Sequence, residues 1–257
     1  MPSRTAYEAA EIERSAIDAS KRPAILRVSP KQMARYLDPH EDTSFPLEYA
    51  FYLLGDVRGK LVLDYGCGAG ESAMLLAARK AYVTAIDISP RLIQLAKKSA
   101  VANGFHVDFR VGSAYETGLP DASVDIVFGQ AILHHLLFDL DAARLEVLRI
   151  LKPNGILILQ EPVRDSRLLA FLRRFIPYSQ NDVSPSERPL RKSELDSFCE
   201  GLSVQAARRF RLPFVPLALL LAPKKWREIY NLDCWLLTKF PFLARYASIE
   251  VRKAVRS

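Results

Sequence analysis

Short apolar runs alternate with amphipathic runs through residues 60–162, and this alternation most narrows the folds open to the chain. Strands alternating with helices at this spacing specify an α/β fold, a doubly wound parallel sheet with helices on both faces. The predicted strands are KLVLDY (60–65), YVTAIDI (82–88), FHVDFRVG (105–112), SVDIVFGQ (123–130) and GILILQEP (155–162), and the predicted helices are GESAMLLAARK (70–80), PRLIQLAKKSAVANG (90–104) and LDAARLEVLRILK (140–152).

The remainder of the chain has a weaker pattern. RKSELDSFCEGL (191–202) predicts a helix with Ser193 as its N-cap, SVQAARRFRL (203–212) a sixth strand and SIEVRKAV (248–255) a last, antiparallel strand. The apolar, proline-punctuated residues 213–246 predict a helical insert that serves as a lid or core cover rather than a membrane anchor. We therefore expect an N-terminal helical lid segment (1–58) followed by one domain (59–257) that contains this insert.

Composition limits the classes of partner. The sequence holds 36 Lys and Arg against 29 Asp and Glu, which could favour acidic substrates, nucleic acid or an anionic membrane surface. Basic residues are not interleaved with aromatic ones as in a nucleic-acid-binding array, so no nucleic acid is expected. Three widely spaced cysteines argue against a disulfide framework or a metal site and suit a reducing cytoplasm. No signal peptide is apparent, and the longest apolar run, at 212–223, is too short to span a bilayer.

A glycine-rich turn in LVLDYGCGAGES (61–72) follows the first predicted strand. The glycines let the backbone turn tightly beside a ligand, next to the free N–H groups of the following helix. A dinucleotide site would have G-x-G-x-x-G, whereas this turn has G-x-G-x-G with Asp64 before it and Glu71 behind it. Acids there suit a cationic amino acid moiety better than a pyrophosphate, and Asp87 at the end of the second strand suits a ribose. S-adenosylmethionine (SAM) meets these requirements, although both aspartates could also be simple caps or turn residues.

Four motifs, VLDYGCGAGE, AIDIS, LPDASVDIVFGQAILHHL and LKPNGILILQEP, closely resemble those of class I SAM-dependent methyltransferases in order and spacing. The resemblance covers roughly residues 59–162. It implies a Rossmann-like, seven-stranded, mostly parallel sheet with a reversed final hairpin, and a SAM site at the ends of the first, second and fourth strands.

The resemblance also implies cofactor-binding roles. The turn backbone would follow the methionine part of SAM, Asp64 would lie near its ammonium group, and Asp87 would hold the ribose. Ile88 would pack on the adenine, and Gln130 would line the methionine moiety. Ser113 and Ala114 stand where relatives often carry an acid facing the adenine amine. This chain has Ser113 there, so the residue that contacts the adenine amine is not identified from the sequence. The turn residues concerned are Gly66, Cys67, Gly68 and Gly70.

Candidate catalytic groups follow the fourth and fifth strands. His134 and His135 could supply a general base, but a similar LHH in relatives commonly serves structure and pocket lining. Glu161 could orient a substrate or merely end its strand. Cys67 is expected to be a packing residue rather than a catalytic thiol. The acceptor pocket is expected between residues 36–52, QAILHHL (130–136), Glu161 and the insert.

Methyl transfer from a sulfonium is an in-line displacement that requires no metal. No NPPY-like tetrad for amide or adenine amines is present in the sequence, so a small, partly apolar acceptor methylated at O, N or C is expected. One alternative is a lipid- or quinone-type acceptor reached at the membrane surface, suggested by the basic, apolar C-terminal part. The other is a non-catalytic SAM-binding module, which the intact glycine motif and Asp87 disfavour.

Overall fold

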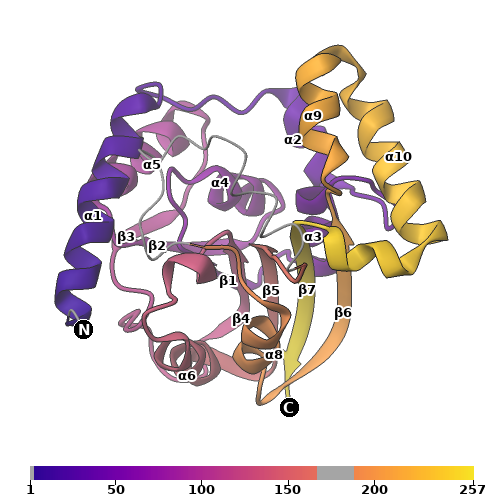
Figure 1. Ribbon diagram of the computed structural model, residues 1–257. Helices are drawn as coiled ribbons and strands as arrows, with labels where there is room; N and C mark the ends of the chain where they lie inside the picture. Colours follow the sequence, from indigo (N-terminus) through magenta and orange to yellow (C-terminus); the bar gives the residue numbers. More distant parts are fainter. Residues whose placement is uncertain (1–2, 167–187) are drawn as a thin grey trace.

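The computed structural model describes residues 3–166 and 188–257, and its centre is a seven-stranded sheet (Figure 1). The strand order is β3-β2-β1-β4-β5-β7-β6, with β7 antiparallel to both neighbours. The order reverses between β1 and β4, and such a switch point leaves a crevice at the carboxyl ends of the strands. The predicted fold class is confirmed. The strands are β1 (Leu61–Tyr65), β2 (Tyr82–Asp87), β3 (Asp108–Val111), β4 (Val124–Gln130), β5 (Leu151–Pro162), β6 (Leu202–Phe210) and β7 (Ile249–Arg256).

Helices cover both faces because consecutive strand residues point to opposite sides of the sheet. Val62 packs in one buried cluster with α3 (Pro46–Leu54), α4 (Glu71–Ala78) and α5 (Pro90–Ala102). Its neighbour Leu63 belongs to the cluster on the other face, which includes α6 (Leu140–Ile150) and α8 (Lys192–Phe198). The two clusters fix the strand register and hence the crevice above β1 and β4.

The predicted helix boundaries differ from the observed ones by up to four residues, and two of the differences have a clear cause. The helix expected over 140–152 ends at Ile150, because Leu151 already pairs with Val124 and starts β5. The helix expected from 191 has Arg191 as its N-cap rather than Ser193, and the Glu194 carboxylate accepts the Arg191 N–H at 2.9 Å. Local propensity alone does not locate these ends, since strand pairing and side-chain caps decide them.

The N-terminal segment divides between two places. α1 (Arg4–Lys21) lies beside α5 at one side of the molecule, whereas α2 (Pro30–Leu37) and α3 lie on the far side of α4 (Figure 1). Phe51 of α3 is fully buried and packs edge-on against Phe128 of β4, with ring centroids 5.3 Å apart. α3 is therefore part of the core, whereas α1 lies where it can cover the crevice.

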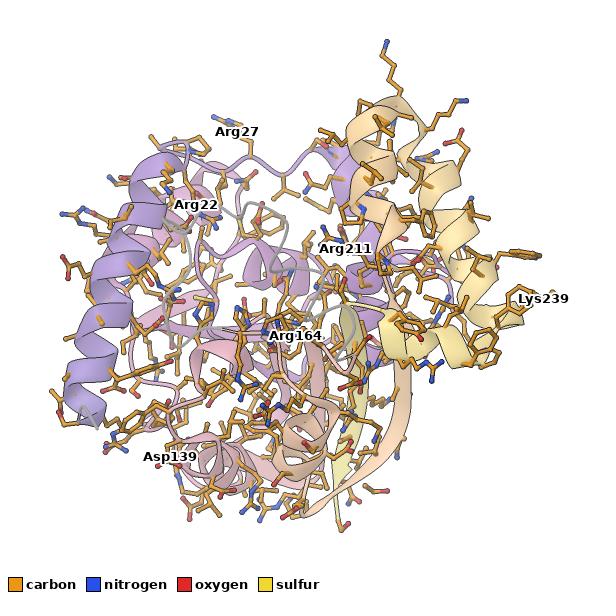
Figure 2. All side chains as sticks on the ribbon, viewed as in Figure 1. Arg22, Arg27, Asp139, Arg164, Arg211 and Lys239 are labelled. Carbon is orange, nitrogen blue, oxygen red and sulfur yellow. The ribbon has the colours of Figure 1, made fainter. Side chains whose placement is uncertain are left out.

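The insert, residues 213–246, forms a helical hairpin between β6 and β7. It comprises α9 (Phe214–Leu221), η4 (Pro223–Lys225), α10 (Trp226–Lys239) and η5 (Pro241–Tyr246). The fully buried Asp233 accepts the backbone N–H groups of Arg211 and Leu212 at 2.7 and 2.8 Å, and Phe45 packs on Trp226. Lys239 projects from the outer side of the hairpin, away from the sheet (Figure 2). No helix among the described residues is long and apolar enough to cross a membrane.

Candidate active site

The glycine turn joins the carboxyl end of β1 to α4, and its three glycines have different tasks. All are left-handed, with φ of 76° at Gly66, 51° at Gly68 and 83° at Gly70. A Cβ on Gly66 would lie 2.4 Å from the Ile132 side chain, and one on Gly70 would lie 2.9 Å from Ala96. A Cβ on Gly68 would meet nothing within 4 Å. The outer two glycines therefore permit close packing, while Gly68 presents bare backbone to open space.

Asp64 ends β1 directly below this turn and is 1% exposed. Its Oδ2 has no hydrogen-bond partner within the described parts of the chain, which is rare for a buried carboxylate. Burial, reinforced by the negative charge of Asp87, raises the pKa of Asp64 to about 7. An unsatisfied buried acid beside a cavity suits a cationic ligand group, which would supply the missing partner.

Asp87 ends β2 with its carboxylate held in one orientation. Oδ2 accepts the Gly68 N–H at 2.8 Å, and Oδ1 accepts the Ser89 N–H at 2.9 Å. Burial raises the pKa of Asp87, and these two N–H groups oppose that rise. Each carboxylate oxygen can accept a further hydrogen bond, so the pair of oxygens suits a vicinal diol such as a ribose.

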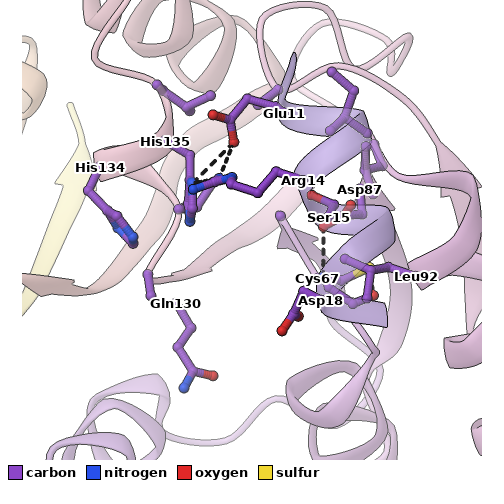
Figure 3. A pocket seen from close by; sticks show the side chains of 18 of the residues that line it. Glu11, Arg14, Ser15, Asp18, Cys67, Asp87, Leu92, Gln130, His134 and His135 are labelled. Atoms are coloured by element: carbon purple, nitrogen blue, oxygen red, sulfur yellow. Dashed lines mark hydrogen bonds and ion pairs between the residues drawn. The ribbon is translucent and has the colours of Figure 1, made fainter. Parts of the chain in front are cut away.

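A cavity of about 640 Å³ lies at the carboxyl ends of β1, β2 and β4 (Figure 3). Its size is that of a site for a small molecule or cofactor. Nine of the ten predicted cofactor residues line it; Gly70 stands behind it, at the N-terminus of α4. The nine are Asp64, Gly66, Cys67, Gly68, Asp87, Ile88, Ser113, Ala114 and Gln130.

Local contacts show what Cys67 and Gln130 can do in the cavity wall. Burial raises the pKa of the Cys67 thiol well above its ordinary value, so Cys67 is poorly suited to act as a thiolate. The Gln130 Oε1 accepts the Ser72 hydroxyl at 2.6 Å, which ties the end of β4 to the first turn of α4.

α1 forms one wall of the cavity; it belongs to the expected N-terminal lid segment, but the pocket was expected at residues 36–52 of that segment instead. The expected cover, residues 36–52 and the insert, contributes no side chain to the lining among the residues described. The α1 residues follow one another at helical spacing, and this polar stripe was the available signal. They are Tyr7, Glu8, Glu11, Arg14, Ser15 and Asp18, and Arg22 follows the helix end.

α1 is held in place by contacts with the segment after β4. The Tyr7 hydroxyl donates to the His135 carbonyl at 2.7 Å, and Arg14 Nη2 lies 2.8 Å from His135 Nδ1. Glu11 pairs with Arg14 and lies 3.3 Å from the same imidazole nitrogen (Figure 3). His135 therefore bridges α1 to the body of the domain.

His134 and Glu161 form a second, deeper pair. Glu161 is fully buried behind the cavity wall, where its Oε1 accepts the N–H groups of Ile132 and Leu133 at 2.8 and 2.9 Å. Its Oε2 lies 3.3 Å from His134 Nδ1, and the His134 side chain lines the cavity. The carboxylate thus fixes both the backbone of this turn and the orientation of the imidazole.

Comparisons with known proteins agree with this geometry. Residues 63–159 match the family model described as "Methyltransferase domain". A ubiquinone biosynthesis O-methyltransferase of Xanthomonas oryzae pv. oryzae is 31% identical over 54% of this chain and 64% of its own. A malonyl-[acyl-carrier protein] O-methyltransferase of Serratia marcescens is 31% identical over 39% of this chain and 37% of its own. The chain spans less than two thirds of either relative.

Among solved structures, a magnesium protoporphyrin IX methyltransferase from Synechocystis PCC 6803 with bound SAH has a TM-score of 0.58. The match covers 98% of this chain and 100% of that chain at 18% sequence identity. At this identity the likeness concerns the fold, and it extends over nearly the whole chain.

Proposed function

We propose that this chain is a class I SAM-dependent methyltransferase that transfers a methyl group from SAM to an oxygen of a small, partly apolar acceptor. The match of residues 63–159 to a methyltransferase-domain model and the names of the relatives support this proposal. The single observation that supports it most strongly is the Asp64 oxygen beside the cavity, which has no hydrogen-bond partner among the residues that the structure describes. The residues present fit SAM: Asp64 would pair with its ammonium group, Asp87 would accept its ribose hydroxyls, and Ile88 would pack on its adenine.

When bound, SAM supplies a methyl group on a positively charged sulfur, which is already an activated leaving group. The chain's residues then have to hold the acceptor in line and keep water out. α1 suits the second task because it lies over the cavity and is tied to the His135 region.

We assign the general base to His134. The buried Glu161 carboxylate would hold the proton on His134 Nδ1, leaving Nε2 unprotonated. As the acceptor oxygen bonds to the methyl carbon and the sulfur–carbon bond breaks, Nε2 would take the hydroxyl proton. Glu161 is then a positioning residue, and His135 holds α1 rather than acting as a base.

The proposal also covers the class of acceptor and the cellular compartment. The names of the relatives favour an oxygen acceptor over nitrogen or carbon. A quinone-type acceptor remains the second candidate, favoured by the name of the Xanthomonas relative. All three cysteines are free, which is consistent with a cytoplasmic setting.

The base assignment is tested by measuring transfer of radiolabelled methyl from SAM to 3,4-dihydroxybenzoate and to caffeate as phenolic probes. His134→Gln should lower kcat by about 100-fold or more, while the SAM dissociation constant stays within about twofold. Glu161→Gln should lower kcat less and shift the acidic limb of the pH profile. His106→Gln, an exposed histidine away from the cavity, is the matched control. If His134→Gln turned over as fast as His106→Gln, the assignment would be wrong.

A further inference from the structure

The insert exposes an apolar stripe that its own domain leaves uncovered. Leu217, Leu220 and Leu221 share one face of α9, and Leu220 and Leu221 are 78% and 76% exposed. A helix that merely packs on its domain turns such a face inward. In this hairpin the side chains that face the domain are others, such as Val215 of α9 and Ile229 of α10, which are buried. The three leucines therefore face away from the domain.

A second group of exposed apolar side chains lies at the far end of the same hairpin. Trp235, Phe240 and Phe242 are all exposed, and consecutive ring centroids in this series lie 6.2 Å apart. Three exposed aromatic rings in series, with Phe240 between the other two, form a patch rather than scattered residues. Trp is also enriched where proteins meet the polar–apolar boundary of a bilayer.

Basic residues accompany both apolar groups. Lys224 and Lys225 follow the leucine stripe, Arg227 comes next, and Lys239 and Arg245 flank the aromatic group; all five are exposed. Lys224 and Lys225 have no ion-pair partner among residues 3–166 and 188–257. The insert has one exposed acid, Glu228, because its other acid, Asp233, is buried beneath it. This surface is therefore both apolar and positively charged.

The insert stands at the edge of the molecule, with the turn between α9 and α10 at the top of the view (Figure 1). It is fixed from below by the Asp233 hydrogen bonds and by Phe45, whose ring centroid lies 5.0 Å from that of Tyr230. The exposed face is thus presented by a preorganised element, which lowers the entropic cost of docking.

We propose that the exposed face of the insert docks on the surface of a lipid bilayer that carries anionic headgroups. Leucines and aromatic rings would enter the interfacial layer, and the lysines and arginines would lie at the headgroups. Neither helix can cross a bilayer, so the contact is peripheral. This role does not depend on the proposed methyl transfer.

Flotation with phosphatidylcholine vesicles, with and without about a third phosphatidylglycerol, tests the proposal. The full chain should float with the anionic vesicles and far less with phosphatidylcholine alone. Lys224→Gln/Lys225→Gln should reduce the partition coefficient at least tenfold at low salt, and Leu220→Ser/Leu221→Ser should reduce it similarly at low and high salt. The matched controls Lys97→Gln/Lys98→Gln and Val101→Ser/Leu145→Ser change exposed residues of α5 and α6 and should bind normally.

Three outcomes would overturn this assignment. The first is a wild-type chain that floats with neither vesicle. The second is equal loss of binding in the insert variants and their controls. The third is a wild-type chain that binds no vesicles and sediments as a dimer, while Leu220→Ser/Leu221→Ser sediments as a monomer. That result would mean that the exposed face of the insert binds a second copy of the chain. Circular dichroism and SAM binding show separately that each variant is folded.

Discussion

At the scale of single residues, Asp64 carries most of the argument for the ligand. It is fully buried near the end of β1, close to Asp87, and one of its carboxylate oxygens has no hydrogen-bond partner in the described part of the chain. A negative charge in such a place is unfavourable unless a cation neutralises it. Because the pKa of Asp64 is raised to about 7, the ligand-free fold holds this acid mainly protonated below about pH 7. The stability that protonation provides is present at low pH and is lost as the pH rises through about 7.

This pKa predicts the pH dependence of SAM binding. A cationic ligand needs the carboxylate, so below about pH 7 each binding event must release a proton from Asp64. Lowering the pH from about 7 to 6 should weaken binding several-fold, toward the tenfold limit for one proton. Isothermal titration calorimetry in buffers of different ionisation enthalpy measures both the affinity and the released proton. Asp64→Asn should bind more weakly at pH 7 and lose most of this slope; an unchanged slope in Asp64→Asn would contradict the role.

At the scale of elements, the strands were predictable and the cavity cover was not. Apolar runs ending in aspartate predicted β1 and β2 because a buried parallel strand has few other sequence solutions. The glycines of the turn predicted a tight turn beside a ligand; that Gly66 and Gly70 also allow close packing on Ile132 and Ala96 is visible only in the fold. An N-terminal lid segment was expected, but the lining role of α1 was not located within it, because its glutamates and arginines have the pattern of a solvated helix face. Only the tertiary fold brings that face over the cavity.

α1 also brings an acid, Glu8, to the position where the sequence lacks the acid that faces the adenine amine in relatives. Ser113 occupies the position where relatives often carry an acid, and its hydroxyl donates to Glu8 of α1 at 2.5 Å. We predict that Glu8 accepts the adenine amine in place of that acid. Glu8→Gln should weaken SAM binding about tenfold, since a hydrogen bond to a charged group contributes about 1.5–3 kcal/mol.

The matched control for this prediction is Glu13→Gln, an exposed acid on the same helix that does not line the cavity. S-adenosylhomocysteine and its inosine analogue, which lacks the amine, should differ less in affinity for Glu8→Gln than for wild type. A difference of the same size in both proteins would exclude the contact.

At the scale of the whole molecule, α1 and the insert flank opposite sides of the carboxyl edge of the sheet (Figure 1). The position of this edge followed from the strand pattern, because a doubly wound sheet binds ligands where its order reverses. The place of the insert did not follow: its apolar, proline-punctuated sequence favoured a lid or core cover, but none of its residues lines the cavity among those that the structure describes. Contacts distant in sequence set its position, notably Phe45 with Trp226 and Asp233 with the chain after β6.

The central claim is that the cavity above β1, β2 and β4 is a SAM site, and calorimetric titration of the wild type with SAM and with NAD tests it most directly. We expect SAM to bind and NAD to bind far more weakly, because Asp64 and Glu71 flank the glycine turn where a pyrophosphate would have to lie. Asp87→Asn, which keeps the shape of the side chain, should lose at least tenfold in SAM affinity as two charge-assisted hydrogen bonds weaken. Tighter binding of NAD than of SAM, or an unchanged SAM dissociation constant in a folded Asp87→Asn protein, would contradict the claim.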